Sequence, residues 1–324
     1  MKAPSFWHID GLVPKILEPA ANVYNIISII NRTLISRTNI GVPIICVGNI
    51  VSGGAGKTPI ALSIGKILGK NYNVGFLTRG YGGSVAGPVQ VKTDQHTIDE
   101  VGDEALLLTK VAPTWVSKNR KAGAFSAKAA GVEVIIMDDG FQNPSVHKDL
   151  SLIIIDGPYG FGNGRVIPAG PLREKISTGL IRADIIVVIG ECSEATKLQF
   201  PPDLPVFYAS ISPDISNTAF SNKNVIGFAG IGRPEKFLTT LKGMDLNILD
   251  FIPFPDHYRF SEIEILNLYS KAIKLNAYLV TTVKDLTRVP KNVSHLCKPI
   301  TVSIDWEDEP KLKELLYATV NQNE

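Results

Sequence analysis

The chain has 324 residues, of which 44% are hydrophobic and 20% charged, so intrinsic disorder is excluded and a large core divided between two domains is expected. The formal net charge of +2 and the lack of an arginine-rich tract argue against a nucleic-acid partner. Three isolated cysteines argue against a disulfide framework or a cysteine zinc site and are typical of a reducing cytosol: Cys46, Cys192 and Cys297.

The first 40 residues contain an uncharged apolar segment between residues 19 and 31, preceded by Trp7 and flanked by basic residues. The segment is shorter than the ~20 residues that span a bilayer, and asparagine and serine interrupt it. It also lacks the A-x-A cleavage site of a signal peptide. These features favour a helix that lies in the membrane interface. A helix packed on the core is the alternative.

A glycine-rich loop between an apolar strand and a helix is the strongest motif of the chain (PIICVGNIVSGGAGKTP, residues 43–59). In this context backbone N–H groups surround phosphate oxygens, Lys57 adds a positive charge and the Thr58 hydroxyl ligates Mg²⁺. The usual motif, G-x-x-x-x-G-K-[ST], has glycine where this chain has Val51. An ordinary glycine-rich turn is the alternative. The residues predicted to bind nucleotide are Val51, Ser52, Gly53, Gly54, Ala55, Gly56, Lys57 and Thr58.

Two more loops follow. Residues 74–77 predict a buried strand that ends in TRGYGG, at the sheet edge that faces ligands in open α/β folds. The segment VGDE precedes a helix expected over 105–111, and its Asp103 occupies a position typical of an N-cap. Two basic residues downstream either contact phosphate or are solvated: Arg120 and Lys121.

A third apolar run, residues 132–137, predicts a buried strand that ends in DDGFQ. An apolar strand followed by acidic residues, downstream of a phosphate loop, resembles a Walker B element. Asp138 and Asp139 are therefore predicted to lie near Mg²⁺ and to order its water shell. A turn made by paired aspartates is the alternative.

The segment PAGPLRE, residues 168–174, follows another strand and is rich in proline and glycine, which predicts a stiff loop. Arg173 in this loop is predicted to neutralise charge in a phosphoryl transition state, the role of an arginine finger supplied in cis. A surface ion pair between Arg173 and Glu174 is the alternative.

A polar stretch at residues 212–224 predicts a domain boundary, and strands and helices alternate again beyond it. We therefore expect an amino-terminal helix (1–38), a P-loop domain of the NTPase type with a mostly parallel sheet (39–215) and a smaller α/β domain (216–324). The smaller domain is expected to contain a long helix capped by Ser261 and a single strand over 300–304.

His257 lies in the segment FPDHY between an expected strand and this long helix. A neutral imidazole in such a rigid, proline-framed loop is suited to proton transfer. Taken alone, a single histidine is more often structural.

Eight motifs occur together in the order and spacing of the tetraacyldisaccharide 4'-kinase (lipid A 4'-kinase) family: GNIVSGGAGKTP, TRGYGG, VGDE, DDGFQ, PAGPLRE, FAGI, FPDHY and VTTVKD. The chain resembles this family over most of its length. The resemblance implies transfer of the γ-phosphate of ATP to the 4'-hydroxyl of a tetraacyldisaccharide 1-phosphate, with Mg²⁺. It also implies a peripheral place on the cytoplasmic face of the bacterial inner membrane, with the amino-terminal helix on the membrane surface. No protein partner is inferred.

The same resemblance implies roles for particular residues. Asp103 and His257 would act together as the base for the sugar hydroxyl, a dyad that domain closure would assemble. Asp139 is a further candidate for the catalytic machinery, with Arg173. Thr58 and Asp138 would hold Mg²⁺.

The chain departs from the family pattern at three positions. Asn143 replaces the histidine that usually follows DDGFQ, Lys175 replaces a proline, and Val283 replaces a glutamate. None of these positions lies in the phosphate loop or the proposed dyad.

Two rival functions remain. A membrane-associated nucleotide switch would need no proton acceptor, and the chain lacks the N-K-x-D segment of guanine recognition, since Asn222-Lys223-Asn224-Val225 has no aspartate. A membrane scaffold with a degenerate nucleotide site is the other rival, and the intact Lys57 argues against it.

Overall fold

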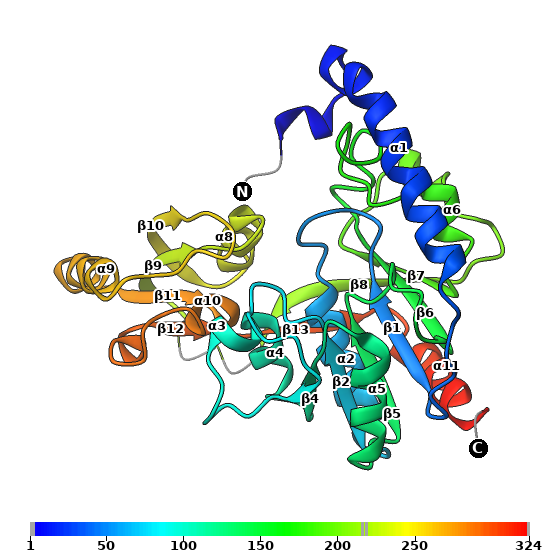
Figure 1. The fold of residues 1–324 in the computed structure, drawn as a ribbon. Coiled ribbons are helices and arrows are strands. Elements are labelled where there is room, and N and C mark those ends of the chain that lie inside the picture. Colours follow the sequence, from blue (N-terminus) through cyan, green and yellow to red (C-terminus); the bar gives the residue numbers. More distant parts are fainter. Residues whose placement is uncertain (1–3, 215–216, 218–219, 323–324) are drawn as a thin grey trace. The chain divides into compact units, whose positions relative to one another are not determined.

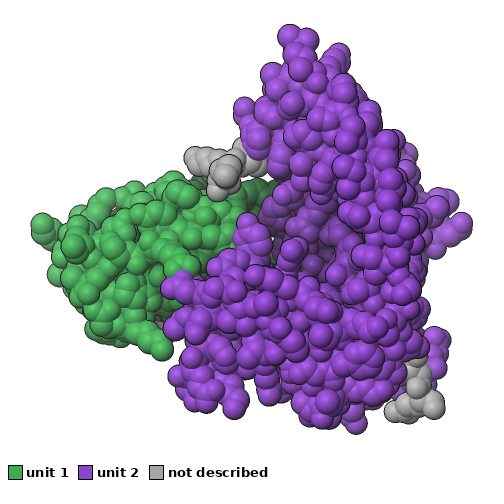
Figure 2. Space-filling view, in the orientation of Figure 1, with its two compact units in different colours: residues 1–2, 211–305 green, residues 3–210, 306–324 purple. Residues whose placement is uncertain are grey.

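The computed structural model describes residues 4–214, 217 and 220–322, which form two compact units (Figure 2). Among them, the large unit holds residues 4–210 and 306–322, and the small unit holds those between 211 and 305. The domain boundary expected between residues 215 and 216 falls outside the described residues. The α/β fold with a mostly parallel sheet is confirmed.

A nine-stranded sheet has the order β13-β8-β7-β6-β1-β5-β2-β4-β3 (Figure 1). Its strands are β1 (Ile44–Gly48), β2 (Val74–Thr78), β3 (Val89–Gln90), β4 (Thr114–Val116), β5 (Val134–Asp138), β6 (Leu150–Asp156), β7 (Ile185–Ile189), β8 (Val206–Pro213) and β13 (Val302–Trp306). The pairs from β8 to β4 are parallel, and β3 pairs with β4 in antiparallel fashion. Every residue of β1, β2, β5, β6 and β7 is buried, which explains their apolar sequences. Their carboxyl ends share one edge of the sheet, where the glycine-rich, TRGYGG and DDGFQ loops begin.

The helices of the large unit are α1 (Leu12–Leu34), α2 (Lys57–Leu68), α3 (Ile98–Val101), α4 (Asp103–Leu108), α5 (Arg120–Ala129), α6 (Ile176–Leu180), α7 (Glu194–Lys197) and α11 (Glu309–Asn321), with the 3₁₀ turn Ser5–His8. Gly102, with a φ of 82°, separates α3 from α4. The expectation that Asp103 caps a helix is wrong, because Gly102 is the N-cap and Asp103 is the first helical residue. Helix α11 packs on α2, where the Tyr317 hydroxyl donates to the Ile67 carbonyl.

Figure 1 shows α1 as a long helix of the large unit, and its buried and exposed residues lie on two different faces. One face is buried on the large unit through Pro14, Ala21 and Asn25. At about 100° per residue the opposite face carries exposed large apolar side chains: Leu12, Ile16, Val23, Ile27, Ile30 and Leu34. Within the described part of the chain, no helix combines the length and the apolar character that crossing a membrane requires.

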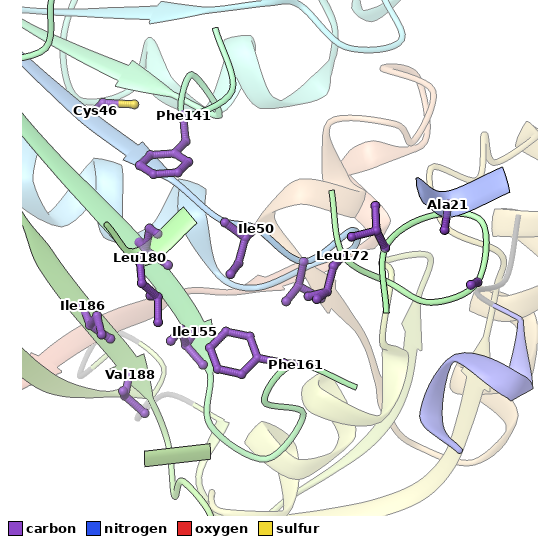
Figure 3. Close-up of a cluster of buried hydrophobic side chains, with 14 residues drawn as sticks. Ala21, Cys46, Ile50, Phe141, Ile155, Phe161, Leu172, Leu180, Ile186 and Val188 are labelled. Atoms are coloured by element: carbon purple, nitrogen blue, oxygen red, sulfur yellow. The ribbon is translucent and has the colours of Figure 1, made fainter. Parts of the chain in front are cut away.

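A buried apolar cluster joins the loops at the sheet edge to α1 (Figure 3). Ile50 follows β1, Phe141 follows β5, and Leu172 lies in the loop before α6. Ala21 of α1 belongs to the same cluster. Because these apolar side chains are close-packed, the polar residues next to them in sequence are held in fixed positions.

The small unit contains a parallel sheet in the order β10-β9-β11-β12. Its elements are β9 (Lys223–Ala229), α8 (Pro234–Lys242), β10 (Leu246–Pro253), α9 (Glu262–Lys274), β11 (Tyr278–Thr282), α10 (Val283–Leu286), a 3₁₀ turn (Ser294–Leu296) and β12 (Lys298–Ile300). Ser261 caps α9 as predicted, in a capping box with Glu264.

The single strand expected over residues 300–304 is wrong. Two strands, β12 and β13, replace it, and Thr301 separates them. The Asn217 side chain explains the break, because it donates to the Thr301 carbonyl at 2.7 Å and accepts from the Thr301 N–H at 3.2 Å. Strand β12 belongs to the four-stranded sheet and β13 to the nine-stranded sheet.

Candidate active site

The glycine-rich loop, residues 49–56, joins β1 to α2. Gly53 and Gly56 have φ angles of 118° and 90°, which glycine adopts without strain. A Cβ atom built at Gly53 or Gly54 would meet no atom within 4 Å, so this side of the loop can receive a ligand. Helix α2 begins at Lys57, and its unpaired N–H groups and dipole favour an anion at this end. The loop therefore has the shape and polarity of a phosphate site.

Val51 replaces a glycine of the usual motif, and its surroundings explain why a β-branched residue is accepted. Val51 forms an isolated antiparallel bridge with Leu172 of the PAGPLRE segment. Its carbonyl accepts from the Asn49 side-chain amide at 2.6 Å, and the Ser52 N–H donates to the Pro171 carbonyl at 2.8 Å. A bridged, extended backbone suits valine. The first part of the glycine-rich loop is thus held by hydrogen bonds to the PAGPLRE segment.

Asp138 ends strand β5, beside the phosphate loop that follows β1, because Val47 pairs with Asp138 across the two strands. The Thr58 hydroxyl donates to Asp138 Oδ2 at 3.0 Å. Asp138 is 1% exposed, and its Oδ1 has no hydrogen-bond partner among the described residues. Burial and then the neighbouring Glu104 raise the pKa of Asp138 to about 7, although Lys57 opposes them. A buried carboxylate oxygen beside a threonine hydroxyl is a donor set that fits hydrated Mg²⁺.

Asp139 turns the chain sharply after the strand, with a φ of 53°. Arg173 donates to both of its carboxylate oxygens, at 2.7 and 3.2 Å, and Lys57 Nζ lies 3.7 Å from Oδ1. Burial alone would raise the pKa of Asp139, but Lys57 and Arg173 outweigh it and lower the pKa to about 2. Asp139 is therefore ionised at neutral pH and holds the two cations next to the phosphate loop.

The alternative of a surface ion pair between Arg173 and Glu174 is wrong. Glu174 is fully buried, and its carboxylate accepts from Arg32 of α1 and from Arg182. Gln142 of the DDGFQ segment also donates to Glu174, at 3.2 Å. Glu174 therefore ties α1 to the loop that carries Asp139. Only the position of Glu174 next to Arg173 could have drawn attention to it in the sequence.

Arg120 is 4% exposed at the start of α5 and donates to the Ser117 carbonyl. Its Nε has no hydrogen-bond partner in the described part of the chain. Burial and then the neighbouring Arg79 lower the pKa of Arg120 to about 10, so it stays charged at neutral pH, and Asp139 is one of its attractive neighbours. The alternative that Arg120 is solvated is wrong.

The two members of the expected dyad lie in different units. Asp103 is 3% exposed in the large unit, and its Oδ1 accepts from the Glu104 N–H at 2.8 Å. His257 lies in the small unit between β10 and α9, with a φ of 56°. Its backbone N–H donates to the Gly230 carbonyl at 3.0 Å, which fixes this unusual conformation.

Asn143, where the family usually has histidine, shapes a local turn. Its Oδ1 accepts from the Ser145 N–H at 3.0 Å and from the Ser145 hydroxyl at 2.7 Å. The other two departures lie at helix starts, since Lys175 precedes α6 and Val283 begins α10.

The large unit thus gathers Lys57, Thr58, Asp138, Asp139 and Arg173 at one edge of its sheet. Lys57 and Arg173 contact Asp139, and Arg120 is a further cation whose pKa responds to Asp139 and Asp138. Oδ1 of the buried Asp138 carboxylate has no hydrogen-bond partner among the described residues and could accept a water of a hydrated divalent cation. Such a set stabilises the charge of a polyphosphate and of a phosphoryl group in transfer. Phosphoryl transfer is the reaction class that this arrangement supports.

Comparisons with known proteins agree on one family. The family model "Tetraacyldisaccharide-1-P 4'-kinase" matches residues 13–321. A tetraacyldisaccharide 4'-kinase of Rhodospirillum rubrum is 44% identical over 98% of this chain and 97% of its own length, and one of Paramagnetospirillum magneticum is 44% identical over 99% of both chains. A crystal structure of LpxK from Aquifex aeolicus in complex with ATP has a TM-score of 0.78 and 27% identity, covering 95% of this chain and all of the other.

Proposed function

This chain belongs to the tetraacyldisaccharide-1-P 4'-kinase family, and we propose that it transfers the γ-phosphate of ATP to the 4'-hydroxyl of a tetraacyldisaccharide 1-phosphate, a step in making lipid A. The resemblance seen in the sequence motifs is confirmed. One observation carries the proposal: Lys57 and Arg173 both form ion pairs with Asp139 beside the glycine-rich loop. The space next to Gly53 and Gly54 in this loop can receive a ligand.

We propose that the phosphate loop, residues 51–58, holds the phosphates of ATP, with Lys57 contributing charge. Thr58 and Asp138 would hold Mg²⁺ and its water, and this cation, when bound, neutralises charge on the transferring phosphoryl group. Arg173 would stabilise the same charge, and its two hydrogen bonds to Asp139 keep its guanidinium in position.

The acceptor hydroxyl must lose a proton as the new P–O bond forms. We propose that Asp103 and His257 act together to take it, and that the large and small units act as two domains whose closure assembles this dyad. A base divided between two domains would be complete only when both substrates are bound, which protects ATP from attack by water.

Wild-type protein is expected to transfer labelled γ-phosphate from ATP to tetraacyldisaccharide 1-phosphate in detergent micelles. Lys57→Ala should transfer about 10²-fold more slowly or worse, because the outer phosphates lose their positive partner. Lys66→Ala, on the same helix, serves as the control. Hydrolysis of nucleotide by the wild type with no labelled lipid product would contradict the kinase and favour a nucleotide switch.

We propose that α1 lies on the membrane surface, at the cytoplasmic face of the inner membrane, where a lipid substrate would be reached. Support comes from its exposed apolar face, on which Leu12 is 74%, Ile16 67% and Leu34 78% exposed. The opposite face is fastened to the large unit through Ala21 and Arg32. A helix with one anchored and one exposed apolar face suits the boundary of headgroups and acyl chains.

Replacing Ile16, Val23 and Ile27 together by glutamine is expected to weaken binding to phosphatidylethanolamine–phosphatidylglycerol vesicles at least tenfold, since each side chain would lose about 1.5–3 kcal/mol of apolar burial. Flotation with vesicles measures this. Ile181→Gln with Leu198→Gln, which changes two exposed residues outside α1, is the matched control. Equal vesicle binding by the wild type and the triple variant would overturn the membrane role of this face.

A further inference from the structure

Three motifs of the small unit meet at Gly230, the residue that follows β9. Its N–H donates to Asp285 Oδ1 at 3.1 Å. Its carbonyl accepts from the His257 N–H at 3.0 Å and from Arg288 Nη1 at 2.6 Å. A Cβ at this position would lie 3.1 Å from both the Pro255 carbonyl oxygen and Tyr258 Cβ, so a glycine is the residue that fits without displacement. The segments FAGI, FPDHY and VTTVKD are therefore joined through one peptide.

Arg288 is held in place by a buried ion pair. Its Nη1 lies 3.0 Å from Asp285 Oδ1, and the two side chains are 2% and 0% exposed. The other oxygen of Asp285 accepts from the Thr282 hydroxyl at 2.7 Å, and the Asp285 N–H donates back to that hydroxyl at 2.9 Å. A buried pair with this many hydrogen bonds fixes the direction of the guanidinium.

The second terminal nitrogen of this guanidinium lies near His257. Arg288 Nη2 lies 3.5 Å from His257 Nδ1. A guanidinium only donates hydrogen bonds, so Nδ1 must present its lone pair to Arg288. At the other side of the ring, Nε2 lies 3.8 Å from Asp256 Oδ1, a carboxylate that attracts an N–H. Both neighbours favour a proton on Nε2 and a lone pair on Nδ1.

The loop that carries His257 is also rigid. Phe254, Tyr258 and Phe260 pack edge-to-face or tilted against one another, with ring centroids 4.8–5.3 Å apart. The Tyr258 hydroxyl donates to Glu264 of α9 at 2.6 Å. The backbone of His257 is thus held in place, so a contact from Arg288 can fix the orientation of its ring.

We propose that Arg288, held by Asp285, is a positioning residue that fixes the orientation and the Nε2–H tautomer of His257. This inference rests on the proposed function, in which His257 and Asp103 act on the sugar hydroxyl. In that step the dyad takes the proton of the hydroxyl. The hydroxyl oxygen forms the new P–O bond, and the bond from the γ-phosphorus to ADP breaks.

The test measures the kinetics of phosphate transfer and, by NMR, the tautomer of the His257 ring. Arg288→Met removes the donor and keeps much of the side-chain volume. We expect kcat for transfer to fall about 10- to 100-fold, with the KM for ATP changed less than about twofold, because the phosphate loop lies in the large unit. In full-length protein labelled with ¹⁵N-histidine at about pH 8, the two-bond ¹H–¹⁵N spectrum should show His257 as Nε2–H in the wild type and as a mixture in Arg288→Met. The His257→Gln variant identifies the signal.

Removing one partner of a buried pair can prevent folding, so a second variant is needed. Asp285→Asn with Arg288→Met removes both charges and keeps an acceptor for the Gly230 N–H, and it should show the same loss of kcat and of the tautomer. Lys291→Met, an exposed site three residues from Arg288, is the control. Wild-type tautomer and kcat in a folded double variant would overturn the role of Arg288. Absence of transfer by the wild type would instead overturn the proposed function, and the spectrum would still report the tautomer.

Discussion

Replacing Asp103 by asparagine, or His257 by glutamine, is expected to lower kcat for phosphate transfer about 10²- to 10⁴-fold. Each replacement keeps the size of the side chain and removes its capacity to take or relay a proton. The KM for ATP should change little, because Lys57 and the glycine loop remain intact. Transfer of labelled phosphate in micelles under saturating lipid measures kcat directly.

The kcat of the double variant, Asp103→Asn with His257→Gln, should lie within about tenfold of the kcat of the slower single variant. When two groups act as one unit, the losses in rate from removing each of them do not add. Asp203→Asn and His295→Gln change exposed residues of the same types, in the large and small units respectively, and should keep the wild-type rate. If both single variants retain wild-type kcat, the proton acceptor lies elsewhere, and Asp139 is the next candidate.

The sequence was sufficient for the features that depend on short spacing. The strand, glycine loop and helix around Lys57 lie within about 25 residues, and each element has a clear periodicity or glycine signal. The carboxyl ends of parallel strands lie at one edge of a sheet. Two apolar runs, which form β1 and β5, each end in a polar loop, and this pattern was enough to predict that Asp138 lies near Thr58.

Features that depend on distant partners could not be predicted in this way. Glu174 is buried because Arg32, 142 residues away, and Arg182 neutralise it, and no local pattern encodes that pairing. Arg120 begins a helix like many solvated arginines, and only the packing around it shows that it is buried. Thr301 separates β12 from β13 because a side chain 84 residues away, Asn217, binds its backbone. Burial and long-range hydrogen bonds decided all three.

Asp138→Asn is expected to give a protein that is more stable than the wild type above neutral pH and has lost at least about 10²-fold in transfer rate. In the absence of metal and nucleotide, burial raises the pKa of Asp138 from 3.8 to about 7. Between these values the unfolded chain releases the proton that the folded chain keeps, so the free energy of unfolding falls as pH rises and the penalty is complete above about pH 7. A rise of about three in pKa corresponds to roughly 4 kcal/mol at most.

Urea denaturation in EDTA at about pH 5 and pH 8 measures this difference, and the advantage of Asp138→Asn should be larger at the higher pH. The neighbouring Asp139→Asn is the matched contrast, because the pKa of Asp139 is lowered to about 2. A carboxylate of that kind contributes stability above about pH 4, so its loss should destabilise the protein at both pH values by roughly 1–2 kcal/mol, allowing for partial exposure.

Mg²⁺ with ATP should stabilise the wild type more than Asp138→Asn, since the buried carboxylate then gains the cation that offsets its desolvation. If the wild type and Asp138→Asn are equally stable at pH 8, burial of the ionised Asp138 carboxylate costs no free energy of unfolding. The reason for assigning Mg²⁺ to this carboxylate would then be lost.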